Sequence, residues 1–65
     1  GDFEMIKKTV MASDGVNRTV EGKIFDDQLR IYRVFGDVTN LDALKETAQI
    51  LALETNVTEV VYMHL

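Results

Sequence analysis

The chain has 65 residues, with seven Lys and Arg, eleven Asp and Glu, and a formal net charge of -4. A domain of this size buries only about 60% of the surface of its unfolded chain, which leaves little room for a deep active site. The sequence contains no cysteine, which excludes disulfides, a thiolate nucleophile and cysteine-ligated zinc. No stretch approaches the ~20 apolar residues of a membrane span and no pattern indicates a signal peptide, so we expect a cytoplasmic location.

The first four residues, GDFE, are expected to be the remnant of an expression tag, because the MIKKTV stretch from Met5 reads as a natural start. Residues 5–65 are then a single small α+β domain. Without Asp2 and Glu4, the formal charge of the natural part is -2.

Three strands are predicted over residues 5–12, 18–25 and 29–35, where apolar and polar side chains alternate. The turn-forming stretches SDGVN and DDQ separate them, so the strands form two consecutive hairpins. Gly22 lies inside the second strand and indicates a bulge or a close backbone approach. Strict alternation divides the third strand into one face with Leu29, Ile31 and Phe35 and another with Arg30, Tyr32 and Val34.

A helix is predicted after Gly36, with Thr39 or Asn40 as its N-terminal cap and Asn56 as its left-handed terminator. Apolar residues recur at helical spacing and must face the sheet; they are Leu41, Leu44, Ala48 and Leu51. The closing stretch VTEVVYMHL predicts a fourth strand that is apolar on both faces. The element order is therefore β-β-β-α-β, and we expect the last strand to add beside the first, which gives the spatial order 3-2-1-4.

Three candidate chemical sites each have a structural explanation that we favour. A phosphate cradle at Gly36 would be opposed by the neighbouring carboxylates of Asp37 and Asp42, which suit a capped helix start instead. The adjacent Asp26 and Asp27 could hold a magnesium ion, but a tight turn also favours aspartate. His64 is the one histidine and has no candidate nucleophile near it. The sequence therefore predicts a protein that is not an enzyme, with no metal and no cofactor.

Nucleic-acid binding is a second possibility, because six of the seven basic residues fall in the first three strands and their connecting turn. Arg30 and Tyr32 share a strand face, and such a pair on an open sheet can stack on unpaired bases. The acidic balance, with a pI near 4.7, disfavours this function, since phosphate binding depends on positive charge.

The element order and the helix start TNLDAL resemble the partial ribonuclease-H-like domain of HicB-type antitoxins. In that family the helix commonly opens with threonine, two variable residues, an acid and alanine-leucine, which Thr39, Asp42, Ala43 and Leu44 match. The chain has no proline and so lacks the proline-containing segment usual between the second and third strands of that family. The resemblance implies a catalytically dead domain that binds and blocks a partner protein.

We therefore expect a non-enzymatic protein-interaction module of the inhibitor or antitoxin type, encoded by a phage or mobile element. The alternatives are a single-stranded nucleic-acid-binding sheet and a small-molecule-binding domain at a dimer interface. The final strand is expected to pair with its twofold mate in a homodimer, or else to add to a strand of the partner. The expected interaction residues are Val60, Val61, Tyr62, Met63, Arg30 and Tyr32.

Overall fold

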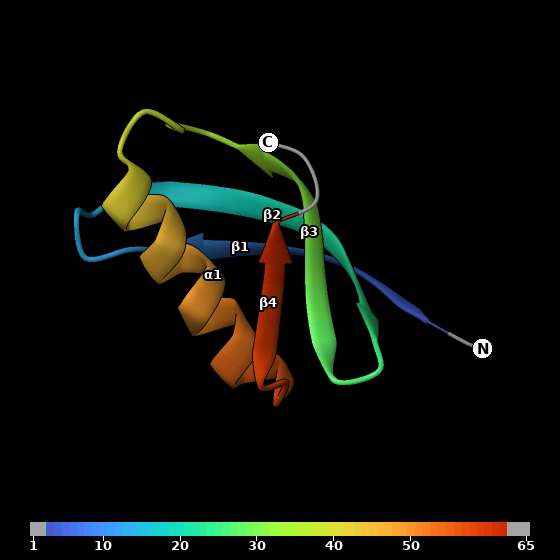
Figure 1. The fold of residues 1–65 in the computed structure, drawn as a ribbon. Helices are drawn as coiled ribbons and strands as arrows, with labels where there is room; N and C mark the ends of the chain where they lie inside the picture. The colour runs from blue at the N-terminus through green and yellow to red at the C-terminus, as the bar shows by residue number, and fades with distance from the viewer. Residues whose placement is uncertain (1–2, 63–65) are drawn as a thin grey trace.

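A computed structural model describes residues 3–62 and contains a four-stranded mixed sheet with one helix. The elements are β1 (Glu4–Met11), β2 (Asn17–Phe25), β3 (Gln28–Phe35), α1 (Leu41–Thr55) and β4 (Glu59–Tyr62). The first three strands form two antiparallel hairpins, and α1 lies against one face of the sheet (Figure 1). The predicted α+β class and the β-β-β-α-β order are confirmed.

The strand order in the sheet is β1-β2-β3-β4, so the predicted order 3-2-1-4 is wrong. β4 runs parallel to β3, with Leu29 opposite Val60 and Ile31 opposite Tyr62. In a meander, the first and third strands run in the same direction, so either can accept a parallel fourth strand. The edges of the sheet are consequently β1 and β4, and β3 is an inner strand.

The pairing of β2 with β3 shifts by one residue at Gly22, as the isolated glycine predicted. Gly22 lies opposite Ile31 and Glu21 lies opposite Arg33, so Tyr32 is the extra residue on β3. A Cβ on Gly22 would lie 2.6 Å from the carbonyl oxygen of Arg30, which explains why only glycine fits there.

Beyond the bulge, each side chain of β3 lies on the face opposite to the one that strict alternation predicts. Val34 packs against the core, whereas the Phe35 side chain is 41% exposed on the other face. The assignment from strict alternation is therefore wrong for these two residues, because one extra residue shifts a period of two by one step.

Local capping defines both ends of α1. Asn40 is the N-cap, and its side-chain oxygen accepts a hydrogen bond from the Ala43 N–H at 3.2 Å. Asn56 ends the helix in the left-handed conformation, with φ of 61°. Asn40 was one of the two predicted caps, and Asn56 was the predicted terminator.

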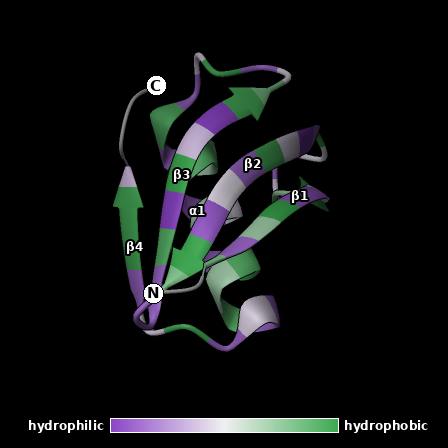
Figure 2. Cartoon of the chain, turned by 90° about the vertical axis from the view of Figure 1, so that its right-hand side faces the viewer, coloured by the Kyte–Doolittle hydropathy of each residue, from purple (hydrophilic) through white to green (hydrophobic). Residues whose placement is uncertain are grey.

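The core lies between α1 and the sheet. The cluster joins strand residues from β1, β2 and β3 to one side of the helix. Its buried members are Val10, Val20, Leu29, Ile31, Ala48, Leu51 and Ala52. The helix covers one face of the sheet, and within residues 3–62 no second layer covers the other face (Figure 2).

Candidate interaction surface

The uncovered side of the sheet carries apolar and basic side chains together, and we call it the open face. Viewed from this side, hydrophobic and hydrophilic residues form alternating bands along the strands in front of α1 (Figure 2). Its apolar side chains are 37–59% exposed. The open face is defined by Met5, Met11, Phe25, Phe35, Lys7, Lys23, Arg30 and Arg33.

Each phenyl ring of the open face lies near a cation. Lys7 Nζ is 5.4 Å and Arg33 Cζ is 5.3 Å from the centre of the Phe35 ring. Arg30 Cζ is 5.6 Å from the centre of the Phe25 ring. These distances fall within the range of cation–π attraction, so the basic groups are held over the aromatic ones.

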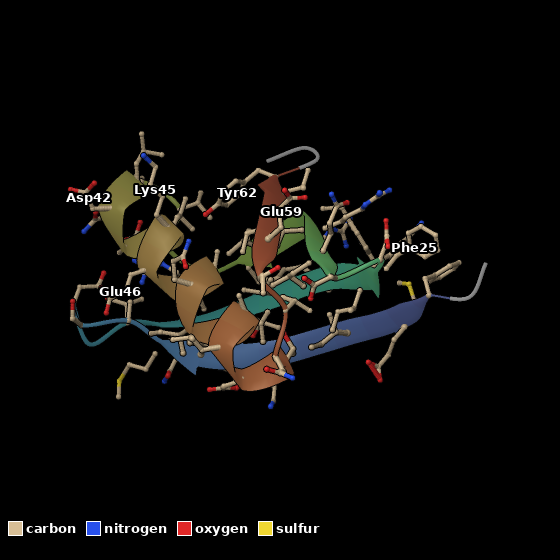
Figure 3. All side chains as sticks on the ribbon, turned by 60° about the horizontal axis from the view of Figure 1, so that its bottom comes forward. Phe25, Asp42, Lys45, Glu46, Glu59 and Tyr62 are labelled. Carbon is tan, nitrogen blue, oxygen red and sulfur yellow. The ribbon has the colours of Figure 1, made fainter. Side chains whose placement is uncertain are left out.

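Positive charge is concentrated on this face of an otherwise acidic molecule. Within residues 3–62, the open face holds four basic side chains against two carboxylates, Glu21 and Glu59. Glu21 lies in register between Lys7 and Arg33 and has its carboxylate 3.8 Å from the Arg33 guanidinium. The other carboxylates of residues 3–62 lie on the helix side of the sheet, in the turns, or on α1, as Asp42 and Glu46 do (Figure 3).

The expected interaction residues are divided between the two faces. Because β4 lies beside β3, Arg30 and Val61 are direct neighbours on the open face. Val60 faces the other way and packs against the core, and Tyr32 is half-buried at the bulge. Met63 lies outside the described residues.

Tyr62, the last described residue of β4, faces the helix side. It borders a shallow hollow of about 140 Å³ with Leu41, Leu44 and Lys45. Figure 3 labels the Tyr62 and Lys45 side chains. Tyr62 remains 41% exposed, and its partial burial raises the pKa of the phenol above the usual value. The hollow is too small for most ligands, since typical ligand pockets occupy roughly 300–1,000 Å³.

The helix start after Gly36 is occupied by the protein's own polar groups. The Asp37 carboxylate accepts hydrogen bonds from the N–H and hydroxyl of Thr39 at 2.9 and 2.6 Å, which lower the pKa of that carboxyl. The buried Arg18 donates from Nε to the Asp37 carbonyl at 2.6 Å. Gly36 itself has φ of 115°. The capped-turn interpretation therefore accounts for the residues around Gly36.

Asp26 and Asp27 form the two-residue turn between β2 and β3, with φ of 54° and 61°. Positive φ at both positions is the geometry of a hairpin turn that favours aspartate, asparagine and glycine. The Asp27 carboxylate accepts a hydrogen bond from the Thr58 hydroxyl. His64 lies outside the described residues, and residues 3–62 contain no group of three or more potential metal ligands.

Comparison with known proteins gives no match to a family model, a curated protein or a solved structure. No helix within the described part of the chain is long and apolar enough to cross a membrane.

Strand alternation placed Arg30 on the polar face of the third strand, and the structure puts it on the open face. Arg18, which counted among the basic residues of the strands, is instead fully buried, and the exposed apolar residues of the open face were not predicted. Phe25 continues the outward alternation of Thr19, Glu21 and Lys23, so its exposure could have been predicted. Phe35 could not be assigned without the bulge at Tyr32, because strict alternation places it in the core.

Proposed function

We propose that this protein is a non-enzymatic interaction module that binds a partner protein through the open face. The observation that supports this function is the exposure of four large apolar side chains on one sheet face, Met5 and Phe25 at one end of it and Met11 and Phe35 at the other. Large apolar side chains exposed together on one face commonly mark an interaction site. Phe, Met and Arg are also the residue types enriched in protein interfaces.

The proposal extends to an inhibitor or antitoxin from a phage or mobile element, acting in the cytoplasm. A protein of 65 residues that binds through one sheet face can inhibit its partner by blocking the surface that it covers. The likeness to HicB-type domains adds no support to this class. The likeness rests on the element order and on a helix start in which Thr39 contacts Asp37 and Asp42 lies in the first turn, as in an ordinary capped helix. No family model matches.

Affinity capture from a bacterial lysate, followed by mass spectrometry, tests the proposed function. The wild type is compared with a Phe25→Ser/Phe35→Ser variant and with Leu53→Ser. Leu53 is the matched control because it is 81% exposed on α1, away from the open face. A protein retained by the wild type and the control but lost by the double variant supports the proposal. Recovery of nucleic acid alone, or of proteins that all three chains retain equally, contradicts it.

Self-association along β4 forms a second part of the proposal. β4 pairs with β3 on one side only, and an open edge can pair with a second copy. A face-to-face dimer is disfavoured, because it would bring the basic residues of two open faces together. Edge-to-edge pairing of β4 avoids this repulsion.

A further inference from the structure

The chemistry of the partner can be inferred from the charges of the open face, and this step rests on the proposed function. We infer that the open face binds an acidic protein segment in which Asp or Glu side chains accompany apolar ones. The apolar groups of such a segment would contact Met5, Met11, Phe25 and Phe35. Its carboxylates would pair with the basic residues that lie between and over the phenyl rings.

Lys7 and Arg33 are exposed for such pairing. The Arg33 side chain is 62% exposed although the Glu21 carboxylate lies 3.8 Å from it, and Lys7 is exposed on the other side of Glu21. Arg30 donates from Nε to Gln28 at 2.9 Å and forms no ion pair within residues 3–62. Guanidinium groups bind carboxylates by paired, charge-assisted hydrogen bonds. The face is therefore complementary to negative charge.

Single-stranded nucleic acid fits this surface less well. Base stacking needs a free aromatic face, but Tyr32, the residue expected to stack, is half-buried at the bulge. A polyanion would also meet the repulsion of a chain with net charge -4, since nucleic-acid affinity rests mainly on positive charge. A short acidic segment depends instead on local pairing, because exposed charges are screened beyond about 8 Å at physiological salt.

NMR titration of the isotope-labelled full chain tests this inference with three probes. The probes are a short peptide that alternates Glu with Leu, its counterpart with Lys in place of Glu, and oligodeoxythymidylate. The Glu-Leu peptide is expected to shift the amide resonances of Lys7, Lys23, Arg33 and Phe35, and its binding should weaken with added salt. The Lys-Leu peptide is expected to leave these resonances in place.

Charge reversal supplies the matched variants. Lys7→Glu/Arg33→Glu should weaken Glu-Leu binding by about tenfold or more, because attraction is replaced by repulsion. Lys8→Glu/Lys45→Glu makes the same change in net charge away from the open face and should leave binding within about twofold. Lys8 faces the helix side, where its ammonium lies 3.2 Å from Glu54 in an exposed pair. Thermal unfolding of each variant verifies that it is folded.

Four outcomes would overturn the inference. Equal binding of both peptides at the open face would show apolar docking without charge selection and would leave the proposed function intact. If oligodeoxythymidylate bound the open face more strongly than the Glu-Leu peptide, nucleic acid would be the favoured ligand. That result would contradict both the acidic-segment inference and the proposed function. If the amide resonances of the open face shifted with protein concentration alone, a second copy of the chain would be the molecule that binds this face. If no probe shifted the resonances of the open face, an acidic segment would be excluded as the ligand. The affinity-capture experiment would still decide the proposed function.

Discussion

At the scale of single residues, Arg18 at the start of β2 joins the turn after β1 to the connection between β3 and α1. Its side chain is fully buried, and it donates to the Asp14 carboxylate from Nη1 at 3.1 Å and from Nη2 at 2.8 Å. The same guanidinium holds the Asp37 carbonyl in the connection that leads to α1. A buried charge is tolerated when it is paired and hydrogen-bonded. The turn after β1 is further tied to α1 by Glu46, which accepts from the Ser13 hydroxyl at 2.7 Å.

The Asp14–Arg18 pair predicts how stability depends on pH. The Arg18 hydrogen bonds hold the pKa of the Asp14 carboxyl below its ordinary value of 3.8. A carboxyl with a lowered pKa in the folded state stabilises the fold above its unfolded pKa, and this contribution disappears as pH falls through the folded pKa. We expect the free energy of unfolding in urea to fall from about pH 5 downwards. Asp14→Asn should be less stable at pH 7 and should lose less on acidification. Parallel pH profiles for the two proteins would contradict this role.

At the scale of elements, α1 shows which features local chemistry determines. Its cap, its terminator and three members of its buried stripe (Leu44, Ala48 and Leu51) were predicted correctly, because each depends on residues within a few positions along the chain. The assignment of Leu41 to that stripe was wrong, since this first residue of α1 is 68% exposed. The bulge in β3 is different. Gly22 signalled an irregularity, but the extra residue belongs to the opposite strand, at Tyr32. Which of two paired strands carries an extra residue depends on their pairing, which no local pattern specifies.

A pair of leucines on α1 tests the orientation of the helix. Leu51 is fully buried in the core, whereas Leu53 is 81% exposed. Leu51→Ala should lower the free energy of unfolding by about 2–5 kcal/mol, through lost burial and the cavity that remains. Leu53→Ala should change it by less than about 0.5 kcal/mol, because that side chain is largely exposed. Urea denaturation measures both. Similar losses in the two variants would mean that the helix faces the sheet differently.

At the scale of the whole molecule, the strand order depends on which strand can accept β4. Both β1 and β3 run in the required direction, so the topology rules did not distinguish them. The helix-facing side chains of the two strands differ. Leu29 and Ile31 on β3 are almost fully buried, as in an inner strand, whereas β1 places Lys8 on its helix side. A charged residue pointing inward is typical of an edge strand. Lys8 fits an edge position for β1, but charge alone does not identify the edge, because Arg18 lies on the same side of the inner strand β2.

The proposed dimer is the prediction that belongs to this scale. In the observed order, β4 is an edge strand of only four described residues, with Val61 half-buried and Tyr62 41% exposed. Pairing with a second copy would satisfy its free backbone groups and cover Tyr62, and the association would stabilise a domain with a small core. Analytical ultracentrifugation is expected to show a dimer in the wild type and a dimer weakened by about tenfold or more in Tyr62→Asp, where a charge is placed at the contact. Leu53→Asp adds the same charge at an exposed position of α1 and should leave the dimer unchanged. A wild type that stays monomeric at high concentration would exclude the homodimer and leave the β4 edge available for a strand of the partner protein.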